Sequence, residues 1–429
     1  MDIVVIGGGP AGRTASIEAA SIGANVTLIE NDKIGGTCLH EGCMVVCGLN
    51  DFAKFLLDAE NFKNIGIIDE THDFNFKEVI SGVKNTVTKI SHVLGHETRE
   101  AGAEIVMGKA EIEEGTVLVN NDEYDYDKLI IATGARPNIP PIEGAENAMT
   151  YKDILKLTEL PEKLNIIGSG VIAAEFASVF STFGSEVNVL CRNTFLKALD
   201  DDIKNYVTKN LLPEVLIHEN VSTKEIHEDH ISTEYGKIDG MTLFAAGTIP
   251  NSQIAANYVD LNEKGHIIVD NRMQTSHKNI FAAGDVAGKI GNTPISRAEG
   301  VIAARNACGI HKEMDYNNIP YAINLYYDVA FLNSKTEQKG MEGYIPGSAG
   351  PGSFWRTLEG MTGLTKMSVN QNRGVNNLYS ISPSSRTSMA YISKLLREGQ
   401  TIDDFDDFIE VHPSTDAIYK LMRFFARFE

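Results

Sequence analysis

Cysteine is scarce in this chain. Five cysteines in 429 residues are too few for the disulfide framework of a small secreted domain. Apolar runs are also short, and none approaches the ~18 residues needed to cross a bilayer. The chain opens directly on an apolar segment at residues 2–6 that predicts a buried strand, so no signal or transit peptide is expected before it. We therefore expect a cytoplasmic protein without a membrane partner.

Positive charge is in short supply as well. The chain has 38 lysines and arginines against 58 acidic residues, which leaves a formal net charge of −20. Such a surface repels phosphate backbones, so a nucleic-acid partner is not expected. Hydrophobic residues make up 43% and charged residues 22%, the proportions of an ordinary globular protein. The length predicts roughly two to four domains.

A strand, a glycine-rich turn, a helix and a second strand follow one another in residues 2–30. The turn carries Gly7, Gly9 and Gly12, and the second strand ends in Glu30. Glycines at this spacing allow a tight turn and let a pyrophosphate approach the helix N-terminus. The carboxylate can accept hydrogen bonds from a ribose hydroxyl. The segment therefore predicts a dinucleotide-binding site.

The same pattern recurs in residues 164–192, with Gly168, Gly170 and Ala173 in its turn. Alanine is tolerated at the third position, which only requires a small residue where helix meets strand. No carboxylate ends the second strand, and Arg192 stands close to that place. A basic residue there accommodates a 2′-phosphate, so NADPH is favoured over NADH. The alternative is that Arg192 is simply a solvated surface residue.

Three of the five cysteines, Cys38, Cys43 and Cys47, lie within ten positions of each other. In a cytoplasmic chain, such a cluster indicates redox or metal chemistry rather than structural disulfides. Cys38 and Cys43 are separated by four residues and follow Gly36-Thr37. This segment resembles the redox-active segment of the class I pyridine nucleotide–disulfide oxidoreductases. The overall sequence pattern of the chain is most similar to the dihydrolipoamide dehydrogenase branch.

Three further segments resemble the same family and appear in its order: Thr133-Gly134 at a strand end, Gly284-Asp285 after a later strand, and His412-Pro413 near the C-terminus. The resemblance covers nearly the whole chain. It implies an α/β fold with two Rossmann-like nucleotide-binding domains, for FAD and NAD(P), and a C-terminal α+β dimerisation domain. The expected bounds are 1–148 and 265–310 for a discontinuous FAD domain, 149–264 for the NAD(P) domain and 311–429 for the interface domain.

The resemblance also implies roles for the reactive side chains. Cys43 would be the thiolate that faces the flavin, and Cys38 the interchange thiol that meets the substrate. His412 would shuttle the proton in the site of the other subunit of a homodimer, with Asp416 orienting its ring. The implied activity is FAD-dependent electron transfer between NAD(P)H and a small disulfide or dithiol. The alternatives are reduction of another low-molecular-weight disulfide or of a metal ion, and a non-catalytic flavin-bound redox sensor or partner subunit.

By the same resemblance, further positions are expected to contact the cofactors. Asp285 would bond the flavin ribityl chain, Ala110 would offer its backbone to the adenine, and a helix from about Arg297 to Ala307 would point its N-terminus at the flavin ring. No bound metal is expected. The full set of expected cofactor-binding residues is Gly7, Gly9, Gly12, Glu30, Gly36, Thr37, Ala110, Thr133, Gly134, Gly168, Gly170, Ala173, Glu175, Arg192, Gly247, Gly284 and Asp285.

The chain also departs from the family pattern. The family has a lysine four residues after the second cysteine, paired with a glutamate near the flavin, whereas Cys47 stands there and leaves Glu175 without its expected partner. If both are helical, Cys43 and Cys47 share a face one turn apart. The third thiol could then trap a metal ion or form an alternative disulfide, or it could be a small buried residue in the lysine's place. Asp416 is also shorter than the family's glutamate and one position closer to the histidine.

Overall fold

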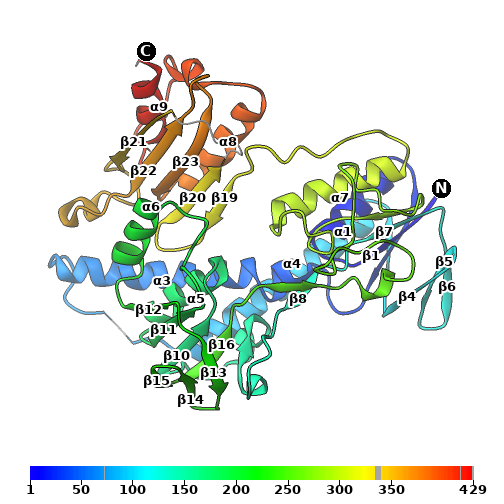
Figure 1. Ribbon diagram of the computed structural model, residues 1–429, viewed down its shortest axis with the longest axis horizontal. Coiled ribbons are helices and arrows are strands. Elements are labelled where there is room, and N and C mark those ends of the chain that lie inside the picture. Colours follow the sequence, from blue (N-terminus) through cyan, green and yellow to red (C-terminus); the bar gives the residue numbers. More distant parts are fainter. Residues whose placement is uncertain (72, 334–339, 416, 428–429) are drawn as a thin grey trace.

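The structure, a computed structural model, describes residues 1–71, 73–333, 340–415 and 417–427. It contains three bodies, each with its own five-stranded sheet, and the long helices α3 (Cys43–Asn64) and α4 (Phe76–Glu100) cross the middle of the view in Figure 1. The fold is α/β, with two Rossmann-like parallel sheets and a C-terminal α+β unit, which confirms the expected fold class. No helix in the described ranges is long and apolar enough to span a bilayer.

Five parallel strands form the first sheet, in the order β18-β7-β1-β2-β3. Their bounds are β1 Asp2–Ile6, β2 Asn25–Glu30, β3 Ala103–Met107, β7 Lys128–Ile131 and β18 Ile280–Ala282. Helix α1 (Pro10–Ser21) connects β1 to β2 and packs against α7 (Thr293–Ala307). Because β1 lies between β2 and β7, the strand order reverses at its carboxyl end, which is where doubly wound sheets bind ligands. A small antiparallel sheet accompanies this body, formed by β4 Ala110–Glu113, β5 Thr116–Val119 and β6 Asp122–Asp125.

The second sheet repeats this plan in the order β12-β11-β10-β16-β9, with all pairs parallel. Its strands are β9 Met149–Thr150, β10 Lys163–Ile167, β11 Glu186–Cys191, β12 Val215–Glu219 and β16 Met241–Phe244. Helix α5 (Val171–Thr182) connects β10 to β11, and α6 (Asp201–Tyr206) precedes β12. A three-stranded antiparallel sheet, β13 Thr223–Ile226, β14 His230–Thr233 and β15 Gly236–Asp239, is inserted before β16. The pair of β8 (Ala135–Pro137) and β17 (Thr248–Pro250) joins the chain segments that enter and leave this body.

The third sheet is antiparallel, in the order β19-β20-β23-β22-β21. Its strands are β19 Tyr321–Ile323, β20 Asp328–Asn333, β21 Met341–Pro346, β22 Leu364–Val369 and β23 Val375–Ser382. Helix α8 (Ser385–Arg397) packs on β20 and β23, while α9 (Ile418–Ala426) packs on β21 and β22. This body lies at the upper left of Figure 1, away from the first sheet at the right.

Helix α7 begins earlier than the sequence pattern suggested. It was expected from about Arg297, but it starts at Thr293 because Asn292 caps it: the Asn292 side chain accepts a hydrogen bond from the Ile295 amide at 2.9 Å. Pro294 then occupies the first turn, where a missing N–H does no harm. The earlier start places Thr293 at the very end of the helix.

The hydrophobic core beside the first sheet contains residues from both segments expected for the FAD domain, 1–148 and 265–310. Ile130 and Ile131 of β7 pack there with Phe281 of β18. Ala255 and Val259 belong to the same core, although they precede the boundary expected at residue 265. The polypeptide thus rejoins the first body directly after β17.

A buried lysine joins the second and third bodies. The Lys366 side chain on β22 is only 6% exposed, and its Nζ lies 2.9 Å from Asp200, 2.7 Å from Asp202 and 3.0 Å from Glu342. Burial opposes the ammonium charge, but the hydrogen bonds to these carboxylates outweigh it and raise the pKa of Lys366 above its ordinary value.

Replacing this lysine should destabilise the fold. We expect Lys366→Met to lower the free energy of unfolding by about 1–3 kcal/mol, because three partly solvated carboxylates would then face each other without a cation. Since the pKa of Lys366 is raised, this contribution is present at neutral pH and is lost only as pH rises through that elevated pKa. Urea unfolding at pH 7 and at alkaline pH measures the difference, and an equal stability of both proteins at pH 7 would contradict it.

Candidate active site

The two cysteines of the redox-like segment lie at the junction of two helices. Cys38 is within α2 (Gly36–His40), and Cys43 is the first residue of α3. Gly36 has a φ of +56°, and a Cβ at this position would lie 2.8 Å from the Cα of Gly9. Only glycine fits there without strain, so the cysteine segment is held directly against the first glycine-rich turn.

The environment of the two thiols makes them unequal. The hydrogen bond from the Cys38 thiol lowers the pKa of Cys43 to about 6, and Thr293 acts in the same direction. The same bond, together with burial, raises the pKa of Cys38. The Thr293 hydroxyl donates to Cys38 Sγ at 3.0 Å and lies 3.8 Å from Cys43 Sγ. At neutral pH this arrangement favours a thiolate at Cys43, where the N-terminus of α3 also stabilises negative charge.

We expect Thr293→Val to raise the pKa of Cys43, since valine keeps the shape of threonine but offers no hydroxyl. The thiolate fraction of the reduced protein at pH 6 should fall several-fold, because the midpoint in the unaltered protein is about 6. A pH titration of thiolate ultraviolet absorbance measures this change. Thr293→Ser retains the hydroxyl and should titrate like the unaltered protein. An unchanged midpoint in the valine variant would exclude a role for this hydroxyl.

The first glycine-rich turn has the shape that a dinucleotide requires. A Cβ on Gly12 would lie 1.9 Å from the Gly7 carbonyl oxygen, so Gly12 is needed for helix and strand to approach. A Cβ on Gly9 would meet nothing closer than 3.9 Å, which leaves room beside the N-terminus of α1. The Glu30 carboxylate is buried at the end of β2 and accepts hydrogen bonds from the amides of Gly8, at 2.6 Å, and Asp32, at 2.8 Å. These features fit FAD.

Two further turns adjoin this cradle. Thr133 and Asn251 hold each other, because the Thr133 hydroxyl donates to the Asn251 carbonyl at 2.7 Å and the Asn251 side chain donates to the Thr133 carbonyl at 3.0 Å. Gly134 follows with a φ of +65° and open space beside it. Ala110 is buried at the start of β4.

The turn after β18 is fixed by a buried glutamate. Glu299 accepts a hydrogen bond from the Gly284 amide at 2.8 Å and another from the Tyr316 hydroxyl at 2.7 Å. Burial raises the pKa of Glu299 to about 7. The neighbouring Asp285 is partly buried, and burial raises its pKa too.

The second glycine-rich turn is open where a nucleotide would lie. A Cβ on Gly168 would approach the Ala245 carbonyl oxygen to 2.2 Å, whereas Gly170, at the N-terminus of α5, has nothing within 4 Å. Ala173 is completely buried between helix and sheet. Arg192 is exposed just beyond β11. Gly247, with a φ of +90°, also has open space beside it. These residues fit a nicotinamide nucleotide.

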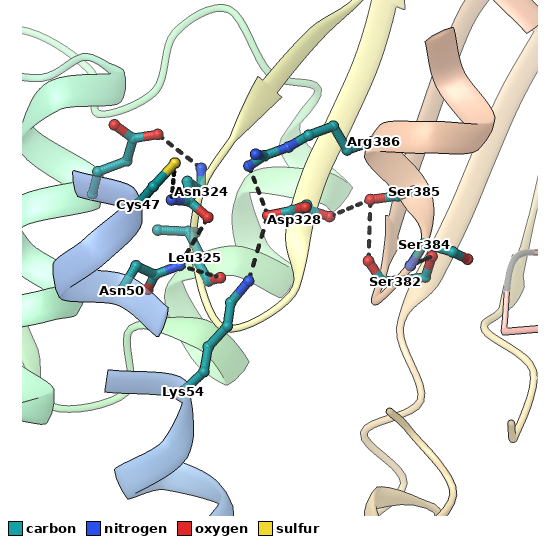
Figure 2. Close-up of polar contacts among 11 residues, drawn as sticks. Cys47, Asn50, Lys54, Asn324, Leu325, Asp328, Ser382, Ser384, Ser385 and Arg386 are labelled. Carbon is teal, nitrogen blue, oxygen red and sulfur yellow. Dashed lines mark hydrogen bonds and ion pairs between the residues drawn. The ribbon is translucent and has the colours of Figure 1, made fainter. Parts of the chain in front are cut away.

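Cys47, one helical turn after Cys43 on α3, takes part in a polar junction with Asn324 (Figure 2). Asn324, which follows β19, donates from its side chain to Cys47 Sγ at 3.7 Å and from its backbone amide to Glu175 Oε1 at 2.8 Å. Asn50 in turn donates to the side-chain oxygen of Asn324 at 2.8 Å. Cys47 is partly buried, and burial raises the pKa of its thiol.

This placement bears on the alternatives considered for the third thiol. Cys43 and Cys47 both belong to α3, four residues apart, which puts their Cβ atoms about 5–6 Å from each other. A disulfide needs about 3.5–4.5 Å, so the helix would have to open before the two could join. No group of three or more histidine, cysteine or acidic side chains suited to a metal ion occurs in the described ranges. The geometry therefore favours Cys47 as a small residue in the lysine's place.

His412 lies on an exposed segment, and its peptide bond to Pro413 is cis. Its ring makes no hydrogen bond or ion pair with the part of the chain that the structure describes. Ile409 and Val411 nearby are 89% and 83% exposed. Asp416, the expected orienting acid, lies outside the described residues.

Three further residues of the site lie outside the family motifs of the sequence. Thr293 could have been placed at a helix N-terminus from Asn292 and Pro294, which are the usual residues at a cap and first turn. Asn324 and Asn251 belong to no recognisable spacing. Each reaches the site through contacts with residues more than a hundred positions away.

Comparisons with known proteins agree with this geometry. Residues 1–300 match the family described as pyridine nucleotide-disulphide oxidoreductase. An uncharacterized protein of Methanocaldococcus jannaschii is 30% identical over 435 residues, which cover 99% of this chain and 98% of that protein. Dihydrolipoyl dehydrogenase 2 of Haloarcula marismortui is 31% identical, with 80% of this chain and 78% of that protein covered. The flavoprotein disulfide reductase RclA from Escherichia coli has a similar structure, with a TM-score of 0.86, 25% identity and 98% of each chain covered. The chain therefore belongs to the pyridine nucleotide-disulphide oxidoreductase family, and this membership implies FAD and a nicotinamide cofactor.

Proposed function

We propose that this flavoprotein oxidoreductase moves electrons between NAD(P)H and a small disulfide or dithiol through Cys38 and Cys43, in the manner of dihydrolipoamide dehydrogenase. The observation that carries the proposal is the inequality of the two thiols. The pKa of Cys43 is lowered to about 6, while that of Cys38 is raised. A dithiol relay needs this asymmetry, because one sulfur must hold charge inside the site while the other exchanges with substrate.

The cofactors would be held by the two glycine-rich turns. FAD would lie along the turn of Gly9, with Glu30 and Asp285 at its sugar portions, and the nicotinamide nucleotide would lie at Gly170. When bound, the flavin would accept two electrons from the nicotinamide and make them available to the cysteine pair.

The side chains of this chain would then carry out the thiol exchange. Cys38, once deprotonated, attacks the substrate disulfide, forms a mixed disulfide and releases the first thiol. The Cys43 thiolate attacks Cys38 Sγ, closes the Cys38–Cys43 disulfide and releases the second product as a thiolate, which takes a proton from solvent. Since the pKa of Cys38 is raised, the attack of Cys38 on the substrate needs a base that takes the thiol proton and returns it to the first leaving sulfur. His412 of a second subunit is proposed for this role.

A homodimer is part of the proposal. The exposed segment with His412 also presents Ile409 and Val411 to solvent. A second subunit would cover these apolar side chains and would bring the histidine to a partner's cysteine pair. We also propose a cytoplasmic location, where a reducing environment keeps a thiol pair available.

Steady-state rates with a panel of disulfides, each with NADH and NADPH, test the proposed activity. Turnover with lipoamide as the best substrate supports the dihydrolipoamide dehydrogenase assignment, whereas preference for another small disulfide moves the protein to that branch. Reduction of metal ions but no disulfide would overturn the proposal. Absence of turnover with every acceptor would indicate a redox sensor or partner subunit.

We expect NADPH to be preferred because Arg192 lies exposed beyond β11, where it can meet a 2′-phosphate. Arg192→Glu should then lower kcat/KM for NADPH about tenfold or more while sparing NADH, since one charge contact to phosphate is worth about 1.5–3 kcal/mol. Lys197→Glu, which changes charge on the same loop, is the matched control. A strong NADH preference of the unaltered protein would contradict the proposed contact between Arg192 and the 2′-phosphate.

A further inference from the structure

Glu175 sits in an unusual position for a carboxylate. It lies on α5 at the junction of all three bodies, partly buried, and Oε1 accepts one hydrogen bond, from the Asn324 backbone amide at 2.8 Å. In the ranges that the structure describes, no cationic side chain lies within 4 Å of it. A partly buried carboxylate without an ion-pair partner is poorly compensated, and this favours its protonated form.

The nearest cations are engaged elsewhere. Arg386 of α8 binds Asp328 at 2.9 Å, and Lys54 of α3 lies 3.7 Å from the same carboxylate. Figure 2 shows both side chains directed at Asp328 rather than at the Cys47–Asn324 contact. The neutral Cys47 thiol occupies the helix position from which a longer basic side chain would reach Glu175. Asn324 contacts Cys47 and Glu175 together, so it fixes their relative placement.

The charges around Glu175 act in opposite directions. The pKa of Glu175 is raised to about 8, with burial as the largest cause, and Cys43 and Asp328 act in the same direction. The Asn324 amide and Arg386 lower it, but they do not outweigh burial. Cys43, whose side chain is exposed, lies one helical turn before Cys47. A thiolate there and a carboxylate at Glu175 would be like charges, and the thiolate therefore favours the protonated form of the acid.

We propose that Glu175 carries a proton at neutral pH and forms with the Cys43 thiolate a coupled pair that bears a single negative charge. Cys47 and Asn324 are positioning residues in this pair: the first leaves the carboxyl group without a counter-ion, and the second holds it by its backbone amide. Glu175 takes its proton from solvent and returns it there as pH rises. The inference rests on the proposed dithiol site, whose thiolate it places beside a neutral acid.

Infrared spectroscopy tests this inference directly. The C=O stretch of a protonated carboxylic acid is separate from the bands of carboxylates, so its intensity reports the proton on Glu175. The spectrum of the reduced, FAD-loaded protein is compared with that of its Glu175→Gln variant. Glu299 and Asp285 also have raised pKa values, and the difference spectrum removes their bands. We expect a difference band at pH 6–7 that disappears with a midpoint near 8. Absence of a difference band at pH 6 would overturn the proposal.

Three variants test what surrounds the acid. Cys47→Lys supplies a counter-ion and should lower the midpoint by about one to three pH units, whereas Cys47→Ser adds no charge and should leave it in place. Cys43→Ser removes the thiolate and should also lower the midpoint. A midpoint that Cys43→Ser leaves unchanged would refute the coupling to the thiolate. A midpoint that Cys47→Lys leaves unchanged would refute the missing counter-ion as the reason for the proton. If Cys47→Lys does not fold, Cys43→Ser and the glutamine comparison still decide the question.

The disulfide reductase rate is measured on the same samples and separates the two proposals. A band with a midpoint near 8 in a protein that reduces no disulfide would retain the neutral Glu175 and reject the proposed function. Disulfide reduction by a protein without the band would retain the proposed function and reject the neutral Glu175.

Discussion

Cys43→Ser and Cys38→Ser should each lower disulfide reductase turnover at least about 10³-fold, because a single thiol cannot close the internal disulfide. The two variants should nevertheless differ in their thiolate. Reduced Cys38→Ser keeps Cys43, whose hydrogen bond can now come from a serine hydroxyl, so a thiolate titrating near pH 6 should remain. Cys43→Ser should lose it, since the remaining Cys38 lacks the thiol hydrogen bond that lowers the pKa of Cys43, and burial still opposes its charge. Thiolate ultraviolet absorbance against pH distinguishes the variants.

Cys38→Ala is the control that isolates the hydrogen bond. The bond from Cys38 is the largest cause of the lowered pKa of Cys43, so alanine should move the thiolate midpoint from about 6 toward the ordinary cysteine value of about 8.5. Serine and alanine remove the same thiol but differ in the hydroxyl. Equal midpoints in these two variants would show that the bond does not set the charge on Cys43. A thiolate that survives in Cys43→Ser would reverse the proposed roles.

Gly12→Ala should abolish FAD retention and destabilise the fold, whereas Gly9→Ala should spare the fold and weaken FAD binding alone. An alanine Cβ at position 12 would lie 1.9 Å from the Gly7 carbonyl oxygen, so α1 must move away from β1. Overpacking of this kind costs about 3 kcal/mol or more when backbone must shift. Gly9 has a φ of −72°, which alanine adopts freely, and a Cβ there has nothing closer than 3.9 Å. Its replacement should cost below about 1 kcal/mol.

The space that a methyl group would fill at Gly9 is the space where the pyrophosphate would lie. We therefore expect FAD to bind the Gly9→Ala variant at least about tenfold more weakly, since backbone and phosphate can no longer approach. Urea unfolding of the apoproteins gives the stabilities, and fluorescence titration gives the FAD affinities. If Gly9→Ala binds FAD normally, the turn does not hold the pyrophosphate. If Gly12→Ala is as stable as the unaltered protein, the close contact is not what joins helix to sheet.

Much of the architecture could be predicted because it depends on local physical rules. The glycine-rich turns at residues 7–12 and 168–173 lie where they were expected, between a parallel strand and a helix. The repetition of that unit predicts two nucleotide-binding bodies, and the family resemblance implied the C-terminal α+β body. Helix α7 starts four residues before the expected position because Asn292 caps it there. The assignment of His412 to a partner's site stays a prediction.

The sequence by itself determined the spacing of Cys38 and Cys43, the small residues of both nucleotide turns and the absence of a lysine at position 47. Each of these features depends only on residues that are close together along the chain. Only the tertiary structure decided which groups surround them. Thr293 reaches Cys38 across 255 positions, and Asn324 reaches Glu175 across 149. Hydrogen bonding and burial set the pKa of a group through contacts in space, and sheet topology rather than spacing brings those contacts together. The charge on Cys43 and the proton proposed for Glu175 therefore belong to the folded chain.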